Sequence, residues 1–172
     1  MAKQGNNLDK LPPQNIEAEK SVLGSILLDR DSINRVIDFL EHRDFYNRSH
    51  QLIFEAMANL YEKSEPIDLL TVTNRLEEMN VLDAAGGASY LTSLFTAVPT
   101  SAHIANYAKI VQRKKILREL IDASHNIIEL GYQEEEDLEN ILDKLPQYFF
   151  SLSNIVLAEK VNIDSVVVGL TV

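Results

Sequence analysis

The longest uninterrupted helical pattern in this chain constrains its fold more than any other feature. The segment from Ala102 to Leu130 contains neither glycine nor proline, and Gly131 follows it. Thr100 or Ser101 can cap its start, and a glycine is a common terminator at its end. At about 1.5 Å per residue, a helix of this length would be roughly 40 Å long. The sequence therefore predicts one long helix, which must find partners along its whole length.

The second half of this predicted helix is apolar over a face too wide for one packing partner. Its apolar residues are Ile116, Leu117, Leu120, Ile121, Ile127, Ile128 and Leu130. After a polar turn over 131–136, a heptad-like apolar period predicts a returning helix, so that 100–153 forms a long antiparallel helical hairpin. Pro146 predicts a kink or an end in that helix.

One hairpin partner covers one face, so the surplus apolar surface predicts a second hairpin from another copy of the chain in a symmetric dimer. The residues predicted to pair the hairpins are Ile116, Leu117, Leu120, Leu138, Ile141, Leu142 and Leu145.

The residues before the long helix have the pattern of a compact globular head. Asn15 can cap a first helix after Pro12 and Pro13, and apolar residues then recur at helical spacing. Five short helices are expected in all: from Asn15, over Ile33–Leu40, over Asn47–Lys63, from Asp68, and around Tyr90–Phe95 before Pro99. We therefore expect an all-α fold with a disordered leader at 1–10, a helical head at 11–99, the hairpin, and a linker or tail at 154–172.

Composition excludes several classes of function. The chain of 172 residues has no cysteine, which excludes zinc ribbons and cysteine nucleophiles. Its 16 basic and 26 acidic side chains give a net charge of −10, which disfavours strong direct binding to DNA. We find no apolar run long enough to cross a membrane and no apolar signal core, and we expect a cytoplasmic protein.

The sequence offers little for catalysis. None of its six glycines belongs to a Walker A loop, and its four histidines have no metal-binding spacing. We therefore predict no catalytic, cofactor-binding or metal-ligating residue on this chain. His50, near the start of a helix, is expected to make a structural hydrogen bond. A small hydrolase that uses His50 with nearby acids is retained as an alternative.

Several short motifs, taken in order, resemble one protein family. They are Leu11-Pro-Pro-Gln-Asn-Ile-Glu-Ala-Glu-Lys-Ser-Val-Leu-Gly24, Asp44-Phe45-Tyr46, His50, Ile53-Phe54, Asp68-Leu-Leu-Thr-Val-Thr73, Gly86-Gly87-x-x-Tyr90-Leu91 and Tyr107-Ala108-x-Ile110-Val111. Over about 11–152 the chain resembles the N-terminal domain of bacterial replicative DNA helicases of the DnaB type.

This resemblance implies a helical head joined to a hairpin, with hairpins pairing so that six subunits form a collar as a trimer of dimers. It implies a RecA-like motor domain after the linker, which would bind ATP and Mg and unwind DNA at the replication fork in the bacterial nucleoid. The chain itself would neither hydrolyse ATP nor unwind DNA. The implied partners are further copies of the chain, the C-terminal domain of primase, and a helicase loader.

Five positions that match the family's motifs are candidates for primase docking: Glu17, Tyr90, Ile121, Ile127 and Ile128. Apart from Glu17, they are also residues that a plain helical core or a dimer seam would contain. A second alternative is the helicase-binding C-terminal domain of a primase, which shares the head-plus-hairpin architecture. Such a domain ought not to begin with Pro-Pro-Gln.

Overall fold

The computed structural model describes residues 11–132, 137–140, 142–144 and 146. Within these residues the chain forms helices and no strand, so the predicted all-α fold is confirmed. The leader, the tail after 153, Ile141 and Leu145 lie outside the described residues. The chain divides into two compact units, one ending at Lys115 and the other beginning at Ile116, and each is described by itself.

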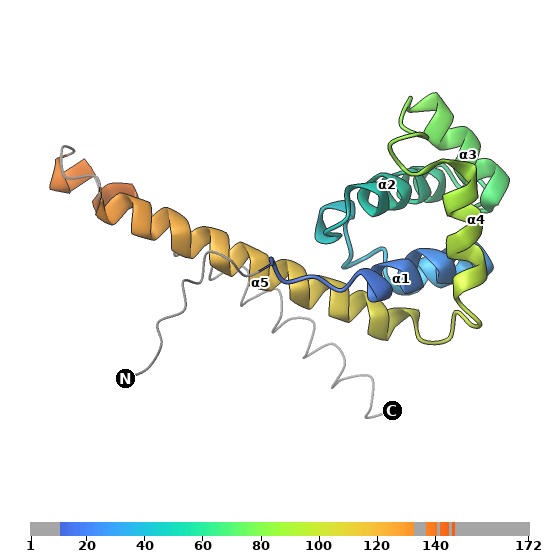
Figure 1. Ribbon diagram of the computed structural model, residues 1–172, viewed down its shortest axis with the longest axis horizontal. Helices are drawn as coiled ribbons and strands as arrows, with labels where there is room; N and C mark the ends of the chain where they lie inside the picture. The colour runs from blue at the N-terminus through green and yellow to red at the C-terminus, as the bar shows by residue number, and fades with distance from the viewer. Residues whose placement is uncertain (1–10, 133–136, 141, 145, 147–172) are drawn as a thin grey trace. The chain divides into compact units, whose positions relative to one another are not determined.

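Seven helical elements have defined bounds among the described residues (Figure 1). They are α1 (Ile16–Leu28), the 3-10 helices η2 (Arg30–Arg35) and η3 (His42–Asp44), α2 (Arg48–Glu62), α3 (Leu69–Glu78), α4 (Gly87–Ala97) and α5 (Ile104–Gly131). The last of these begins in the first unit and continues into the second. Its end at Gly131 is the predicted one.

Polar side chains cap three of the α-helices. Asn15 accepts a hydrogen bond from the backbone N–H of Ala18 at the start of α1, and Asn47 accepts one from Ser49 at the start of α2. Asp68 caps α3 by accepting from two backbone N–H groups. Each cap satisfies donors that have no partner inside the helix, which explains why these helices begin where they do.

The predicted second helix over 33–40 is wrong in type and position. The structure has the 3-10 helix η2 there, which ends at Arg35 and is followed by a turn. Asp29 caps it through the N–H of Asp31, and Ile33 O then accepts from the N–H groups of both Val36 and Ile37. A carbonyl shared in this way is typical of a short segment that alternates between 3-10 and α hydrogen bonding and does not extend into a regular helix.

The core of the first unit lies where α1 and α2 meet α4 and α3. α1 contacts α4, α2 and η2, while α3 contacts α2 and α4 (Figure 1). The first turns of α5 close this core with Ile104, Ala108 and Val111, all of which are buried. Gly24 on α1 allows the backbone of α4 to lie close to α1. A Cβ at position 24 would lie 2.4 Å from the carbonyl oxygen of Leu94.

In the second unit, α5 continues to Gly131, and the described residues 138–140, 142–144 and 146 are also helical. Their helical conformation fits a returning helix. The antiparallel hairpin itself stays a prediction, because the turn at 133–136 lies outside the described residues. The kink or helix end predicted at Pro146 also stays a prediction, because residues 145 and 147 lie outside the described residues.

Candidate functional site

A buried polar cluster joins three helices of the first unit. Glu19 on α1, His50 on α2 and Tyr90 on α4 form a hydrogen-bonded chain, in which Nδ1 of His50 lies 2.6 Å from a Glu19 carboxylate oxygen. The other ring nitrogen, Nε2, lies 2.7 Å from the Tyr90 hydroxyl. Glu19 and His50 are buried, and Tyr90 is half-buried. The cluster therefore connects a core carboxylate to a side chain at the surface.

Backbone donors complete the surroundings of Glu19. Its two oxygens accept from the N–H groups of Tyr46, at 2.7 Å, and Asn47, at 3.2 Å. A buried carboxylate is tolerated only when hydrogen bonds replace its lost hydration, and these donors supply them. Glu19 thereby fixes the segment before α2 against α1, and it orients the first turn of α2 that carries His50.

This arrangement confirms the predicted structural hydrogen bond of His50. A carboxylate, an imidazole and a hydroxyl in a row also occur in hydrolases, where the hydroxyl attacks a substrate. Here the third group is a phenol, and the imidazole and carboxylate are fully buried. The geometry therefore favours a structural cluster over the alternative of a hydrolase that uses His50.

Two of the predicted docking residues, Glu17 and Tyr90, interact electrostatically at the surface of the first unit. Burial raises the pKa of Tyr90, the charge of Lys20 lowers it, and the charges of Glu19 and Glu17 raise it. Lys20 donates a hydrogen bond to the exposed Glu17 carboxylate at 2.9 Å, and this bond raises the pKa of Lys20. Glu17, Lys20 and Tyr90 thus form one charged surface at α1 and α4, which we call the Tyr90 surface.

The remaining docking candidates lie on α5 in the second unit. Ile121 and Ile128 are exposed and Ile127 is half-buried. Leu117 is exposed as well, and the spacing from 117 to 121 to 128 places these three on one helix face. We call Leu117, Ile121 and Ile128 the α5 apolar stripe.

The opposite side of the same helix is more buried. Ala123 and Leu130 are buried there, and Ile116 and Ile127 are half-buried. Of the other residues predicted to pair hairpins, Leu120, Leu138 and Leu142 are exposed, while Ile141 and Leu145 lie outside the described residues. One face of α5 is therefore more buried than the α5 apolar stripe, which faces solvent.

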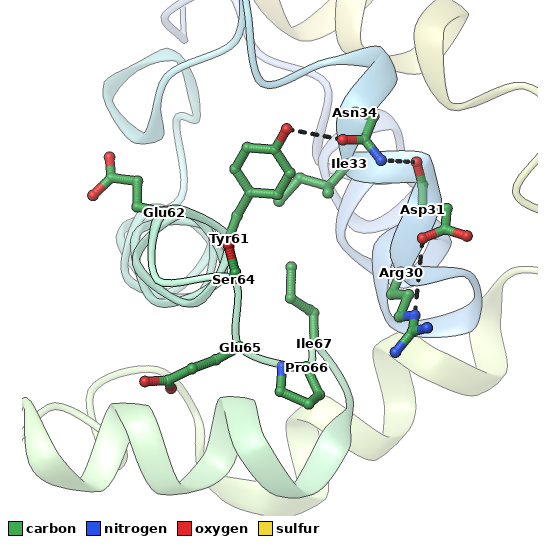
Figure 2. A pocket seen from close by; sticks show the side chains of 10 residues that line it. All are labelled: Arg30, Asp31, Ile33, Asn34, Tyr61, Glu62, Ser64, Glu65, Pro66 and Ile67. Atoms are coloured by element: carbon green, nitrogen blue, oxygen red, sulfur yellow. Dashed lines mark hydrogen bonds and ion pairs between the residues drawn. The ribbon is translucent and has the colours of Figure 1, made fainter.

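The first unit also contains a surface pocket of about 540 Å³ between η2, the end of α2 and the loop before α3 (Figure 2). Its floor is apolar, with Ile33 and Ile67, and its edge is polar. Figure 2 shows that the edge groups bind one another: the Tyr61 hydroxyl donates to Asn34, and Arg30 pairs with Asp31. These contacts occupy part of the polar edge of the pocket.

Glu19 is a member of the buried cluster that the sequence pattern does not single out. Glu17 and Glu19 are both carboxylates in the first turn of α1, where either complements the helix dipole, and no sequence signal separates the two. In the part of the chain that the structure describes, no three His, Asp or Glu side chains gather where a metal could bind. No described helix is long and apolar enough to cross a bilayer.

Comparison with known proteins identifies the family. Residues 11–113 match the family described as DnaB-like helicase N terminal domain. The replicative DNA helicase DnaC of Bacillus subtilis is 46% identical over 136 residues, a stretch that covers 79% of this chain and 30% of the relative. The chain thus spans about a third or less of the length of such curated relatives.

Solved structures give the same assignment. The N-terminal domain of DnaB helicase from Mycobacterium tuberculosis is 37% identical with a TM-score of 0.77, covering 83% of this chain and 99% of that one. The N-terminal domain of DnaB helicase from Helicobacter pylori, described with its interactions with primase, is 27% identical with a TM-score of 0.59, over 68% of this chain and 91% of that one. The alternative of a primase C-terminal domain is therefore wrong, and the chain belongs to the DnaB-like helicase N-terminal domain family.

Proposed function

We propose that this chain is the non-catalytic collar domain of a replicative DNA helicase, which assembles subunits into a ring and docks primase during DNA replication in the cytoplasm. The observation that carries the proposal is the α5 apolar stripe, since three large apolar side chains on one helix face are left uncovered within their own unit. Such a face is typical of a protein interface. The family assignment supplies the context in which that interface works.

Assembly would use the α5 apolar stripe together with the residues predicted to pair hairpins. In a symmetric dimer the same face is buried on both copies, so each exposed leucine or isoleucine contributes twice. The head at 11–99 and the hairpin at 100–153 would form the collar, as a dimer or a hexamer built from three dimers. The segment 154–172 would lead to a RecA-like motor domain that binds ATP and Mg.

Primase docking would use the Tyr90 surface on the first unit, and Ile121, Ile127 and Ile128 are proposed as docking residues on the second unit. The support for primase as the partner is that the Helicobacter pylori domain, of the same family, is described with its interactions with primase. Glu17 is exposed and Tyr90 is half-buried, so both are accessible on the first unit. A helicase loader is proposed as a further partner of the collar.

The first experiment measures assembly by light scattering across a concentration series. We expect the wild-type chain to form a dimer or hexamer, and Ile121→Asp or Ile128→Asp to lower its mass, because a carboxylate is costly to bury in an apolar interface. Asn126→Asp is the matched control, since it adds the same charge at an exposed position of α5. Unchanged mass in both isoleucine variants would contradict the assembly proposal.

The second experiment measures affinity for the C-terminal domain of primase from the same organism. We expect Glu17→Lys to weaken binding by roughly tenfold, because it reverses a charge at the Tyr90 surface. Glu77→Lys makes the same change at an exposed position of α3 and should leave binding unchanged. The docking proposal fails if the wild-type chain shows no binding, or if both variants bind as the wild type does.

A further inference from the structure

We propose that Glu19 and His50 are positioning residues for partner docking, because they fix the hydrogen-bonding role that the Tyr90 hydroxyl presents at the surface. This inference rests on the proposed docking function and deepens it. It assigns a role to two buried residues that touch no partner, and it specifies the chemistry of the partner group that meets Tyr90: a hydrogen-bond donor.

The first step is the placement of a hydrogen on His50. The carboxylate of Glu19 is an acceptor, and it already receives the N–H groups of Tyr46 and Asn47. The 2.6 Å contact between that carboxylate and Nδ1 of His50 is therefore a hydrogen bond that Nδ1 donates. In a neutral imidazole with Nδ1 protonated, Nε2 has no hydrogen and is an acceptor.

The second step follows at Tyr90. Its hydroxyl lies 2.7 Å from Nε2, so the single O–H hydrogen of the phenol points inward to His50. A phenol that has used its hydrogen can only accept further hydrogen bonds. The Tyr90 oxygen therefore accepts from a partner group such as an ammonium, a guanidinium or a backbone N–H. The charged groups around it, Lys20, Glu17 and Glu19, all belong to α1.

The third step concerns the orientation of the Tyr90 side chain, which is contacted at its hydroxyl end and near its Cβ. The rings of His50 and Tyr90 are nearly parallel, with an interplanar angle of 4° and centroids 6.0 Å apart. Near the Cβ of Tyr90, Gly86 has a left-handed φ of 99°, and a Cβ at Gly86 would lie 2.9 Å from the Tyr90 side chain. Glycine allows this backbone to lie against the ring. Tyr90 is thus presented in one orientation before any partner arrives.

Two substitutions at His50 separate its two hydrogen bonds. In His50→Asn, the amide can occupy the place of Nδ1 and keep the bond to Glu19, but no atom replaces Nε2. In His50→Gln, the longer amide can place its oxygen near Nε2 and still accept from Tyr90. Both variants lose ring packing and one hydrogen bond, so they form a matched pair that differs in the contact with Tyr90.

The test is affinity for the primase C-terminal domain, measured on the full chain. Tyr90→Phe and His50→Asn should each weaken binding by roughly three- to tenfold, the equivalent of one hydrogen bond. The double variant should be no weaker than either single one, because both remove the same oriented hydroxyl. His50→Gln should bind within about twofold of wild type. Tyr61→Phe, which removes another bonded hydroxyl of the first unit, should bind as wild type does.

Equal weakening by His50→Asn and His50→Gln, or losses that add in the double variant, would overturn the inference and leave docking intact. Nitrogen NMR of the His50 ring provides a readout that needs no partner. Protonation at Nδ1 in the wild type is expected, and protonation at Nε2 would overturn the inference. If the wild type does not bind primase, the docking proposal fails, whereas the ring measurement still decides whether His50 orients Tyr90.

Discussion

The two units of the chain differ in how far their large apolar side chains are exposed to solvent. In the first unit, residues such as Phe45, Phe54 and Met57 are at most 1% exposed. In the second unit, Leu120 is 46% exposed and Ile128 is 54% exposed. Large apolar residues of the first unit that face solvent, such as Leu70, are normal when they occur singly.

This difference indicates that the first unit determines the stability of the fold and that the second unit provides a surface for association. The first unit buries its core among its own helices, which include the start of α5. Its fold therefore depends on packing within the unit. The second unit has the α5 apolar stripe, whose three residues lie on one helix face. Changes in the first unit should therefore alter stability, and changes on the stripe should alter association. Substitutions in each unit test this division.

The largest effect is expected at Gly24, inside the first unit. Gly24→Ala should destabilise the unit by about 2–4 kcal/mol, since a new methyl group cannot be accommodated without moving backbone. A Cβ there would lie 2.4 Å from the carbonyl oxygen of Leu94 and 2.6 Å from a methyl group of Val98. Chemical denaturation followed by circular dichroism measures the change.

Gly131→Ala is the matched control, because a Cβ at the end of α5 has no neighbour within 4 Å. It should leave the unfolding of the first unit unchanged. If Gly24→Ala lowers the free energy of unfolding no more than Gly131→Ala does, then α1 and α4 do not lie as close together as described. The proposed difference between the two units would then be contradicted.

The next effect is expected at Glu19, in the buried polar cluster. Glu19→Gln should cost about 2–3 kcal/mol, because the amide presents donors to a site where three N–H groups point at the carboxylate. Glu17→Gln is the control two residues away, and its exposed carboxylate should be replaceable without a change in the denaturation midpoint. Equal midpoints for the two variants would contradict a role for Glu19 in holding α1 to α2.

Local signals made much of this fold predictable. Asn15, Asn47 and Asp68 precede amphipathic segments, and each caps a helix in the structure. A cap acts within three residues of its own position, so a single sequence contains the whole signal. The same holds for Gly131, which ends a segment free of glycine and proline.

Contacts between distant residues were not predictable in the same way. Glu17 and Glu19 are the same residue type in the same helical turn, yet one is exposed and the other is buried against α2. Only the packing of residues 46–50 on α1 distinguishes them. The candidate site was therefore predictable in part. Tyr90 and His50 belong to sequence motifs, and a hydrogen bond was expected for His50, whereas the contacts of Glu19 required the three-dimensional arrangement.

A smaller effect is expected at Lys115, whose ammonium lies 3.6 Å from the buried Asp44 carboxylate in the first unit. Burial raises the pKa of Asp44, the backbone N–H of Glu41 lowers it, and Lys115 also lowers it. Lys115→Met should therefore raise the pKa of Asp44 further and cost about 1 kcal/mol at pH 7, where the carboxylate is charged.

The pH dependence gives the sign of that effect. With its pKa raised by folding, Asp44 holds its proton more tightly in the folded state, so its contribution to stability increases as pH falls through the raised pKa toward 3.8. The stability curves of wild type and Lys115→Met should converge there, because a neutral Asp44 no longer needs the ammonium. Lys109→Met removes an exposed charge from the same helix, and its curve should not show this convergence. A cost for Lys115→Met that is equal at pH 3 and pH 7 would contradict the ion pair.

The smallest effect on the first unit is expected from the α5 apolar stripe. Ile128→Asp should leave the amide hydrogen exchange of α1 unchanged, because the core of the first unit includes no residue of the stripe. In the wild type, protection of amides after Ile116 should increase with protein concentration, since association stabilises the unit that it buries. Ile128→Asp should remove this dependence.

Hydrogen exchange at two concentrations, resolved by residue, measures both halves of α5 in one experiment. Protection after Ile116 that is the same at both concentrations would mean that the second unit needs no other copy, and the division between a self-sufficient unit and an associating unit would be wrong.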